Sequence, residues 1–142
     1  MSAAAIVAVR GLWQAYEARD WAAAQALFAP DAVCDWWTSG ERFTGAAAIV
    51  GVNAAYPEGW RIELLAVEEL VDGRIHSLVR VDHGEQSFYA NSFFGFDGED
   101  RIATVEEFWA TADEPPAWRE GLSGRTRLPL RPVTLRPTTT KP

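Results

Sequence analysis

Hydrophobic residues in the first part of the chain recur with helical spacing. Residues 3–18 carry an apolar stripe in which the members lie three or four positions apart: Ile6, Val9, Leu12, Trp13 and Tyr16. This spacing predicts an amphipathic helix with one buried face. Asp20 is suited to cap a second helix over residues 21–28, because its carboxylate can accept hydrogen bonds from first-turn amides. A third apolar-rich run predicts a helix over residues 46–55, with a turn after it.

From residue 60 onward the pattern changes to the alternation that is typical of strands. Four such segments are separated by Asp-Gly or His-Gly pairs, which favour tight hairpins: residues 60–71, 74–82, 86–96 and 101–111. Short links require antiparallel pairing, so these segments predict a meander. Two shorter strands, turning at Ser39 and Gly40, are predicted within residues 31–45.

This order of elements predicts an α+β fold, in which a curved antiparallel sheet wraps around three helices and forms a cone with an internal pocket. We assign residues 1–118 to this domain and residues 119–142 to a basic, Pro- and Thr-rich extended C-terminal tail. The tail has no aromatic residue with which to build a core. We expect it to lie on a surface, either of its own domain or of another subunit. Trp118 is expected to fold back onto the domain as an apolar plug.

The charge of the chain is divided unevenly. Residues 1–118 hold seven basic and nineteen acidic residues, a net charge of −12, whereas residues 119–142 hold six basic residues and one acidic residue, a net charge of +5. An acidic body disfavours nucleic acid as the main partner. Aromatic residues make up 12% of the chain, and in a small domain they must fill the core or line a cavity.

The single cysteine, Cys34, cannot form an internal disulfide and is expected to be a small buried side chain. No apolar run approaches the roughly 20 residues of a membrane span, and nothing has the pattern of a signal peptide. These features predict a soluble, cytoplasmic protein with no membrane partner.

Three stretches resemble the nuclear-transport-factor-2-like superfamily, in its SnoaL-like and ketosteroid-isomerase-like branch. They are Asp20-Trp21 with Ala26-Leu-Phe-Ala-Pro-Asp-Ala-Val33, then Phe43-Thr-Gly-Ala-Ala-Ala-Ile49, and the closing strand Arg101-Ile-Ala-Thr-Val-Glu-Glu-Phe-Trp109. The resemblance implies the cone fold and a homodimer through the open sheet face. It leaves the activity open, because the superfamily includes isomerases, dehydratases, hydrolases, cyclases and non-catalytic binders.

The ketosteroid isomerase residues do not carry over onto this chain. Aligned on Asp20 and Phe28, the family's oxyanion-hole tyrosine falls on Leu12, its catalytic base on Trp36 and its second acid near Ser92. None of these side chains can do that chemistry, so a ketosteroid isomerase in the strict sense is not expected.

Glu107 is the predicted acid–base group. The same alignment, with strand alternation, turns it inward on the last strand. The side chains expected around it are Trp36, Phe94 and Trp109. Such surroundings would raise the carboxyl pKa toward neutrality and let it move a proton on and off a substrate. The alternatives are that Glu106 faces inward instead, or that Glu107 pairs with an arginine such as Arg80.

Asp35 is a second catalytic candidate, although the alignment places it on the outer face, where pairing with an arginine is ordinary. A shift of one residue in register would bring it into the pocket. Asn53 and Tyr56 lie about one helical turn apart and are expected to orient a substrate near the cavity mouth. For Tyr56, a packing role at the helix end is equally expected. The predicted substrate-binding set is Trp36, Asn53, Tyr56, Ser92, Phe94 and Trp109.

These features favour a small enzyme that uses general acid–base catalysis without a cofactor, as an isomerase, cyclase or dehydratase. Its substrate would be an apolar molecule of the polyketide or steroid kind, held in a hydrophobic cavity. The alternative is a module of the same fold that has no catalytic activity and binds a small molecule or another protein. No His, Asp or Glu residues have a metal-ligand spacing, and no glycine-rich phosphate loop follows a strand, so no metal or cofactor is expected.

Overall fold

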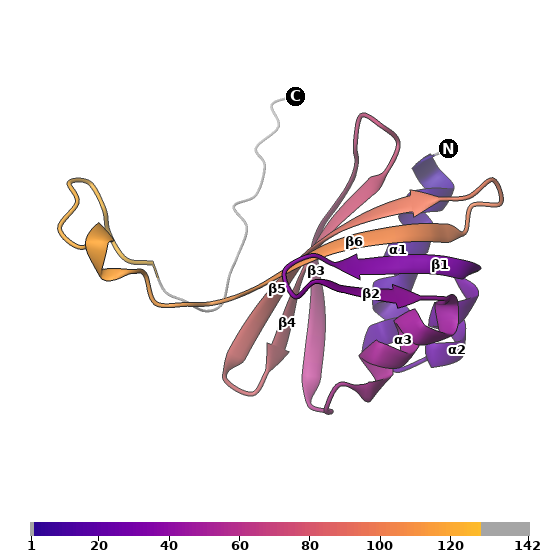
Figure 1. Cartoon of the computed structure of the whole chain (residues 1–142), viewed down its shortest axis with the longest axis horizontal. Helices are drawn as coiled ribbons and strands as arrows, with labels where there is room; N and C mark the ends of the chain where they lie inside the picture. Colours follow the sequence, from indigo (N-terminus) through magenta and orange to yellow (C-terminus); the bar gives the residue numbers. More distant parts are fainter. Residues whose placement is uncertain (1, 129–142) are drawn as a thin grey trace, which may run out of the picture.

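Three helices lie against a single curved six-stranded sheet in the computed structural model, which describes residues 2–128 (Figure 1). The helices are α1 (Ser2–Glu17), α2 (Trp21–Ala26) and α3 (Ala46–Ala55), and a short 3-10 helix η1 (Ala117–Arg119) follows the sheet. The strands are β1 (Phe28–Trp36), β2 (Glu41–Thr44), β3 (Trp60–Glu69), β4 (Ile75–His83), β5 (Gln86–Phe96) and β6 (Ile102–Thr111). The α+β fold predicted from the sequence is confirmed.

The strands follow the order β2-β1-β6-β5-β4-β3 across the sheet. α1 packs on β3 and β4, whereas α3 packs on β1 and β2, so the helices bridge the two ends of the sheet. The sheet therefore curls around the helices without closing into a barrel. The meander from β3 to β6 is antiparallel as predicted, but β1 pairs with β6 in the parallel direction.

Local sequence signals explain most element ends. The Asp20 carboxylate accepts a hydrogen bond from the Ala23 amide at 3.1 Å, which confirms the predicted cap of α2. α2 ends at Ala26, earlier than predicted, and β1 already begins at Phe28. β1 can include Pro30 because its pairing with β6 is irregular between Phe28 and Val33, where a missing N–H is tolerated.

The core lies between the helices and the concave face of the sheet. The predicted stripe of α1 is buried, with Val9, Leu12, Trp13 and Tyr16 at most 4% exposed. The sheet contributes apolar side chains from alternate positions, among them Ile75, Val79, Ala90 and Phe94. Cys34 is buried at 3% exposure, as expected.

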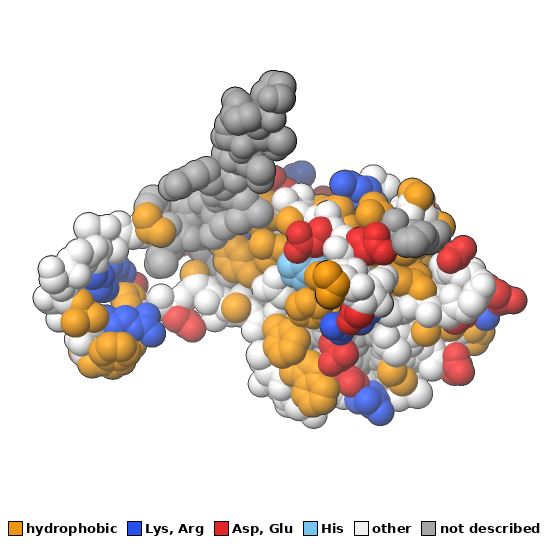
Figure 2. Space-filling model, turned by 90° about the horizontal axis from the view of Figure 1, so that it is seen from above, with side chains coloured by type: hydrophobic (Ala, Val, Ile, Leu, Met, Phe, Trp, Pro, Cys, Tyr) orange, Lys and Arg blue, Asp and Glu red, His pale blue; other side chains and the backbone are white. Residues whose placement is uncertain are grey.

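Trp118 does not fold back onto the domain, so that prediction was wrong. Its side chain is 72% exposed on the segment after β6, which leads away from the sheet in Figure 1. The Arg119 guanidinium lies 5.3 Å from the Trp118 ring centroid, and Arg127 pairs with Glu114 at 3.1 Å. The segment therefore makes local contacts of its own. Figure 2 shows basic side chains on this segment with an acidic side chain beside them.

The predicted tail lies partly outside the described residues, because residues 129–142 are not among them. Among residues 2–128, no helix is long and apolar enough to cross a membrane.

Candidate functional site

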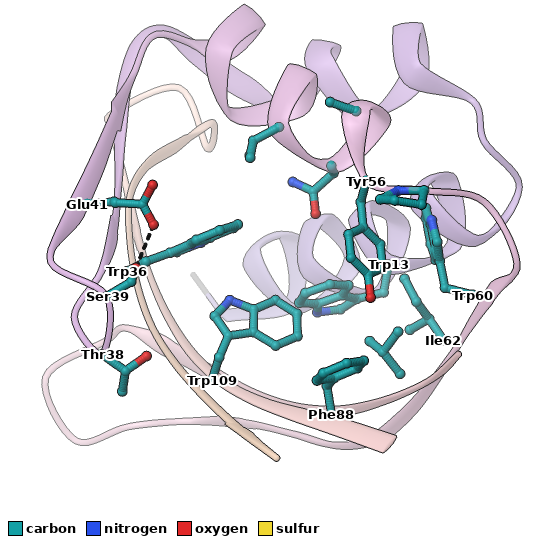
Figure 3. A pocket seen from close by; sticks show the side chains of 15 residues that line it. Trp13, Trp36, Thr38, Ser39, Glu41, Tyr56, Trp60, Ile62, Phe88 and Trp109 are labelled. Carbon is teal, nitrogen blue, oxygen red and sulfur yellow. Dashed lines mark hydrogen bonds between the residues drawn. The ribbon is translucent and has the colours of Figure 1, made fainter. Parts of the chain in front are cut away.

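A cavity of about 550 Å³ opens between the C-terminal half of α3, the turn after β1 and the concave face of the sheet (Figure 3). The residues that line it are Trp13, Trp36, Thr38, Ser39, Glu41, Val52, Asn53, Ala55, Tyr56, Pro57, Trp60, Ile62, Val81, Phe88 and Trp109. Most of them are apolar, and six are aromatic. This size and composition are typical of a site for a small organic molecule.

Tryptophan rings form much of the cavity wall. Trp36 and Trp109 meet edge to face, with ring centroids 6.0 Å apart, and Figure 3 shows them facing Trp60 across the cavity. The indole N–H of Trp13 donates to Ser77 Oγ at 3.0 Å, and that of Trp36 donates to Glu107 Oε1 at 2.8 Å. Neither acceptor lines the cavity, so these two rings offer their carbon surface to a ligand.

Glu107 is buried directly behind this wall. Its side chain is 7% exposed, and besides Trp36 it accepts a hydrogen bond from Ser92 Oγ at 2.7 Å on Oε2. Cys34 Sγ lies 3.8 Å from Oε1. Burial raises the pKa of the Glu107 carboxyl, and the hydrogen bonds from Ser92 and Trp36 offset part of that rise. The Trp109 indole also favours the ionised form, although its N–H does not reach hydrogen-bonding geometry.

Two strand registers bring these groups together. The parallel pairing of β1 with β6 sets Trp36 beside Glu107, and the antiparallel pairing of β5 with β6 sets Ser92 beside it on the other side. Strand alternation turns their sequence neighbours Trp37 and Glu106 outward, where the Trp37 indole donates to Glu106 Oε1 at 2.9 Å. The predicted inward direction of Glu107 is confirmed, and two similar Trp–Glu pairs lie on opposite faces of the sheet.

Asn53 and Tyr16 form a second polar group near the cavity. Asn53 Nδ2 donates to the backbone oxygen of Ile49 at 2.9 Å and lies 3.4 Å from the Tyr16 hydroxyl. Asn53 Oδ1 makes no hydrogen bond to any residue from 2 to 128, so a ligand in the cavity can donate to it. Burial raises the pKa of Tyr16 well above its ordinary value, with smaller contributions from the charges of Glu107 and Cys34.

The predicted site residues divide into three groups. Trp36, Asn53, Tyr56 and Trp109 line the cavity. Glu107, Ser92 and Phe94 lie behind its wall; the last two are fully buried. Asp35 does not join them. It pairs with Arg42 through two hydrogen bonds of 2.7 and 2.9 Å, and the first cause of its lowered pKa is this hydrogen bonding.

A family model for the SnoaL-like domain matches residues 9–105. The chain belongs to the SnoaL-like domain family. Among solved structures, this SnoaL-like domain is similar to a candidate ketosteroid isomerase from Kribbella flavida DSM 17836, with 26% identity, a TM-score of 0.75, and coverage of 89% of this chain and 93% of that one. The resemblance stated from the sequence is confirmed.

Two more distant structures share the fold. An NTF-2-like protein from Burkholderia xenovorans LB400 is 20% identical, with a TM-score of 0.72 and coverage of 89% of this chain and 98% of that one. A candidate polyketide cyclase from Xanthomonas campestris is 22% identical, with a TM-score of 0.61 and coverage of 75% and 90%. No match is found among proteins of curated function.

Several lining residues of this SnoaL-like domain were not predicted as site residues. Trp13, Trp60 and Phe88 look like core aromatics in the sequence, because each falls in a regular apolar pattern. Only the curvature of the sheet leaves them at the edge of an open space. Within residues 2–128, no cluster of three or more His, Cys, Asp or Glu side chains is arranged to hold a metal ion.

Proposed function

We propose that this SnoaL-like domain binds an apolar small molecule in the cavity and transforms it by proton transfer, as an isomerase, cyclase or dehydratase. The observation that carries the proposal is a buried carboxyl, Glu107, whose hydrogen-bonding partner Trp36 is itself part of the cavity wall. The candidate ketosteroid isomerase and the candidate polyketide cyclase among the similar structures support a substrate with fused rings.

The cavity supplies binding through contact with aromatic surface. A volume of about 550 Å³ lies within the range of sites that hold molecules of drug size. An apolar ligand that displaces water from these indole and phenyl surfaces gains binding free energy roughly in proportion to the apolar area covered. Asn53 Oδ1 offers one acceptor that would orient a hydroxyl group of the ligand.

Glu107, which lies behind the Trp36 side of the cavity wall, is proposed as the acid–base group. A raised pKa brings a carboxyl nearer to the working pH, where proton donation and acceptance are both efficient. Because Trp36 separates the carboxyl from the cavity, the proposal has a conformational requirement. The Trp36 indole must release Oε1 when the ligand binds.

A second candidate function is binding without chemistry. The observation in its favour is that each Glu107 oxygen accepts a hydrogen bond from the protein itself, at 2.8 and 2.7 Å. A carboxylate with these partners could serve only to hold the Trp36 ring in place.

We further propose that two copies of the chain pair through the outer face of the sheet. Trp37 and Phe108 support this proposal, because both are large and apolar and are 54% and 42% exposed. Sedimentation of the wild-type chain and of the Phe108→Arg variant tests it. A dimer that dissociates in the variant is expected, and a wild-type monomer would end the proposal.

The experiment that separates the two functions begins with a thermal-shift screen of steroids and aromatic polyketides. The compounds that bind are then tested for conversion by the wild type, Glu107→Gln and the matched control Glu106→Gln, which changes the Trp–Glu pair of the outer face. We expect Glu107→Gln to lower turnover by about 100-fold or more and to leave affinity and the control unchanged. Binding without any turnover by the wild type would favour the binding module, and wild-type turnover in Glu107→Gln would end the role of Glu107.

A further inference from the structure

A hydrogen-bonded relay lies at the mouth of the cavity. The Tyr56 hydroxyl is 2.9 Å from His83 Nδ1, and His83 Nε2 is 3.0 Å from the backbone oxygen of Glu58. A carbonyl oxygen only accepts hydrogen bonds, so Nε2 carries the proton of the neutral imidazole. Nδ1 is then an acceptor, and the Tyr56 O–H donates to it.

The loop after α3 holds the imidazole in this position. Gly59 has a φ of +115°, and a Cβ at this position would lie 3.2 Å from two atoms of the His83 ring. The imidazole therefore packs against a backbone that only glycine leaves open. The Tyr56 ring meets His83 edge to face, with centroids 5.1 Å apart.

Arg19 anchors the same loop from the end of α1. Its guanidinium donates to the Glu58 carboxylate at 2.9 Å and to the Trp60 backbone oxygen at 2.6 Å, and it stacks 3.3 Å above the Trp60 ring centroid. A relay whose members are fixed by their surroundings needs little rearrangement during a reaction.

Only Tyr56 connects this relay to the cavity. Tyr56 lines the cavity, whereas His83 does not. Figure 3 shows the Tyr56 hydroxyl directed toward the side where Ile62 and Phe88 lie. Since the Tyr56 O–H donates to His83, the lone pairs of the Tyr56 oxygen remain available to accept a proton or a hydrogen bond from a ligand. An acidic proton on a ligand therefore has an acceptor within the open cavity, which Glu107 does not provide.

We propose that Tyr56 is the catalytic residue that exchanges a proton with the ligand, and that His83 is the base that takes the phenol proton at the same time. This proposal rests on the proton transfer of the proposed function. It gives the exchange with the ligand to Tyr56, which needs no movement of Trp36, in place of Glu107, which a ligand reaches only after Trp36 releases Oε1. In the step, Tyr56 Oη gains a proton from a ligand C–H or O–H, and the Tyr56 proton moves to His83 Nδ1. The electron pair of the broken bond stays with the ligand, and the reverse transfer restores the relay.

The loop after α3 keeps its contact with the His83 ring in this step. The Nε2–H of the imidazolium continues to donate to the backbone carbonyl of Glu58. The side-chain carboxylate of Glu58 belongs to the same loop. The pKa of that carboxyl is lowered, chiefly by the hydrogen bond from Arg19, and the Gly59 amide lowers it further. The Glu58 carboxylate is paired with the Arg19 guanidinium at 2.9 Å.

The test uses 5-nitrobenzisoxazole, a flat apolar probe that needs only a base. Removal of its ring C–H proton breaks the N–O bond and releases a coloured cyanophenolate, so no other reactant is involved. Binding of the probe is followed separately by quenching of tryptophan fluorescence. The variants are Tyr56→Phe, His83→Ala and Glu107→Gln. The matched control is Tyr89→Phe, which removes a phenol that has no hydrogen-bond partner among residues 2–128.

We expect the wild type to accelerate the elimination beyond an equal concentration of free imidazole. Tyr56→Phe and His83→Ala should each lower the rate of elimination by about 100-fold and should bind the probe as the wild type does. Tyr89→Phe should keep the wild-type rate. Added imidazole should restore part of the rate of His83→Ala and none of the rate of Tyr56→Phe. A structural role for His83 predicts no such rescue.

Three results would overturn the relay. One is a Tyr56→Phe variant that eliminates the probe at the wild-type rate. If Glu107→Gln no longer accelerates the elimination in that case, the proposed function survives with the buried carboxyl as its base. The second is a His83→Ala variant that imidazole does not restore. The third is a wild type that binds the probe without accelerating its elimination.

Discussion

Replacing Ser92 by alanine tests how strongly Glu107 depends on its buried hydrogen bonds. Ser92 is fully buried and donates to Oε2 at 2.7 Å, so its removal takes one of the protein's donors away from a buried carboxyl oxygen. A hydrogen bond to a charged group contributes about 1.5–3 kcal/mol to stability. We therefore expect Ser92→Ala to lower the free energy of unfolding by about 2 kcal/mol at a pH where Glu107 is ionised in the folded chain.

The same strand offers a matched control. Ser87 is also buried, and it donates to the Asp82 carboxylate at 2.6 Å. That carboxylate is 33% exposed and pairs with Arg80, so water and an ion pair remain when the hydroxyl is removed. Ser87→Ala is expected to cost no more than about 1 kcal/mol.

The cost of Ser92→Ala should also depend on pH. At a pH below the ordinary Glu value of 4.5, Glu107 is neutral in both the folded and the unfolded chain, and the lost bond is a weaker one between neutral groups. Above the raised pKa, the folded chain holds a carboxylate that has lost a partner. The loss therefore grows as the pH rises through this window.

Urea unfolding followed by tryptophan fluorescence measures both effects, at one pH below 4.5 and at one well above it. The reasoning is refuted if Ser92→Ala costs no more than Ser87→Ala, or if its cost is the same at the two pH values.

Three further predictions concern other parts of the structure. Because the pKa of Glu107 is raised, the folded chain binds this proton more tightly than the unfolded chain, and the contribution of Glu107 to stability falls as the pH rises above 4.5. Glu107→Gln should therefore flatten the dependence of the free energy of unfolding on pH in this range, as measured with urea. An unchanged slope would count against the buried carboxyl. Burial raises the pKa of the Cys34 thiol, so a disulfide reagent should label it at the rate of global unfolding, and labelling as fast as that of a free thiol would contradict its burial. Arg19→Gln removes the stacking on Trp60 together with the hydrogen bonds to the Glu58 carboxylate and the Trp60 backbone oxygen, and it should lower the free energy of unfolding by about 1 kcal/mol in thermal melts. No loss would show that these contacts together contribute nothing.

Local patterns predicted the elements whose signals are local. The bounds of α3 and β5 match the predicted residues 46–55 and 86–96, because a turn signal flanks each apolar run. The facing of Trp36 and Glu107 was also predictable, because the alignment with the resembling family indicated the inward face and alternation along the strand then placed the neighbours.

Contacts between distant segments left no such signal. The parallel pairing of β1 with β6 joins residues about seventy positions apart, and no periodicity in either strand reveals its partner. For the same reason Tyr56 could be placed near the cavity mouth from its helical spacing, but its partner His83 could not. The position of Trp118 was mispredicted because hydrophobicity alone does not show whether a segment rich in proline returns to the core.

The most direct test of the account is whether an apolar ligand occupies the cavity. Val52 lines the cavity on α3, so Val52→Trp places an indole in the ligand's space, whereas Val71→Trp makes the same change at a fully exposed position. The measurement is the stabilisation by the tightest compound of the screen at about 100 times its dissociation constant, where about 2.7 kcal/mol is expected for the wild type. The account predicts that Val71→Trp keeps this stabilisation and Val52→Trp loses most of it. Equal stabilisation of the two variants would contradict binding in the cavity.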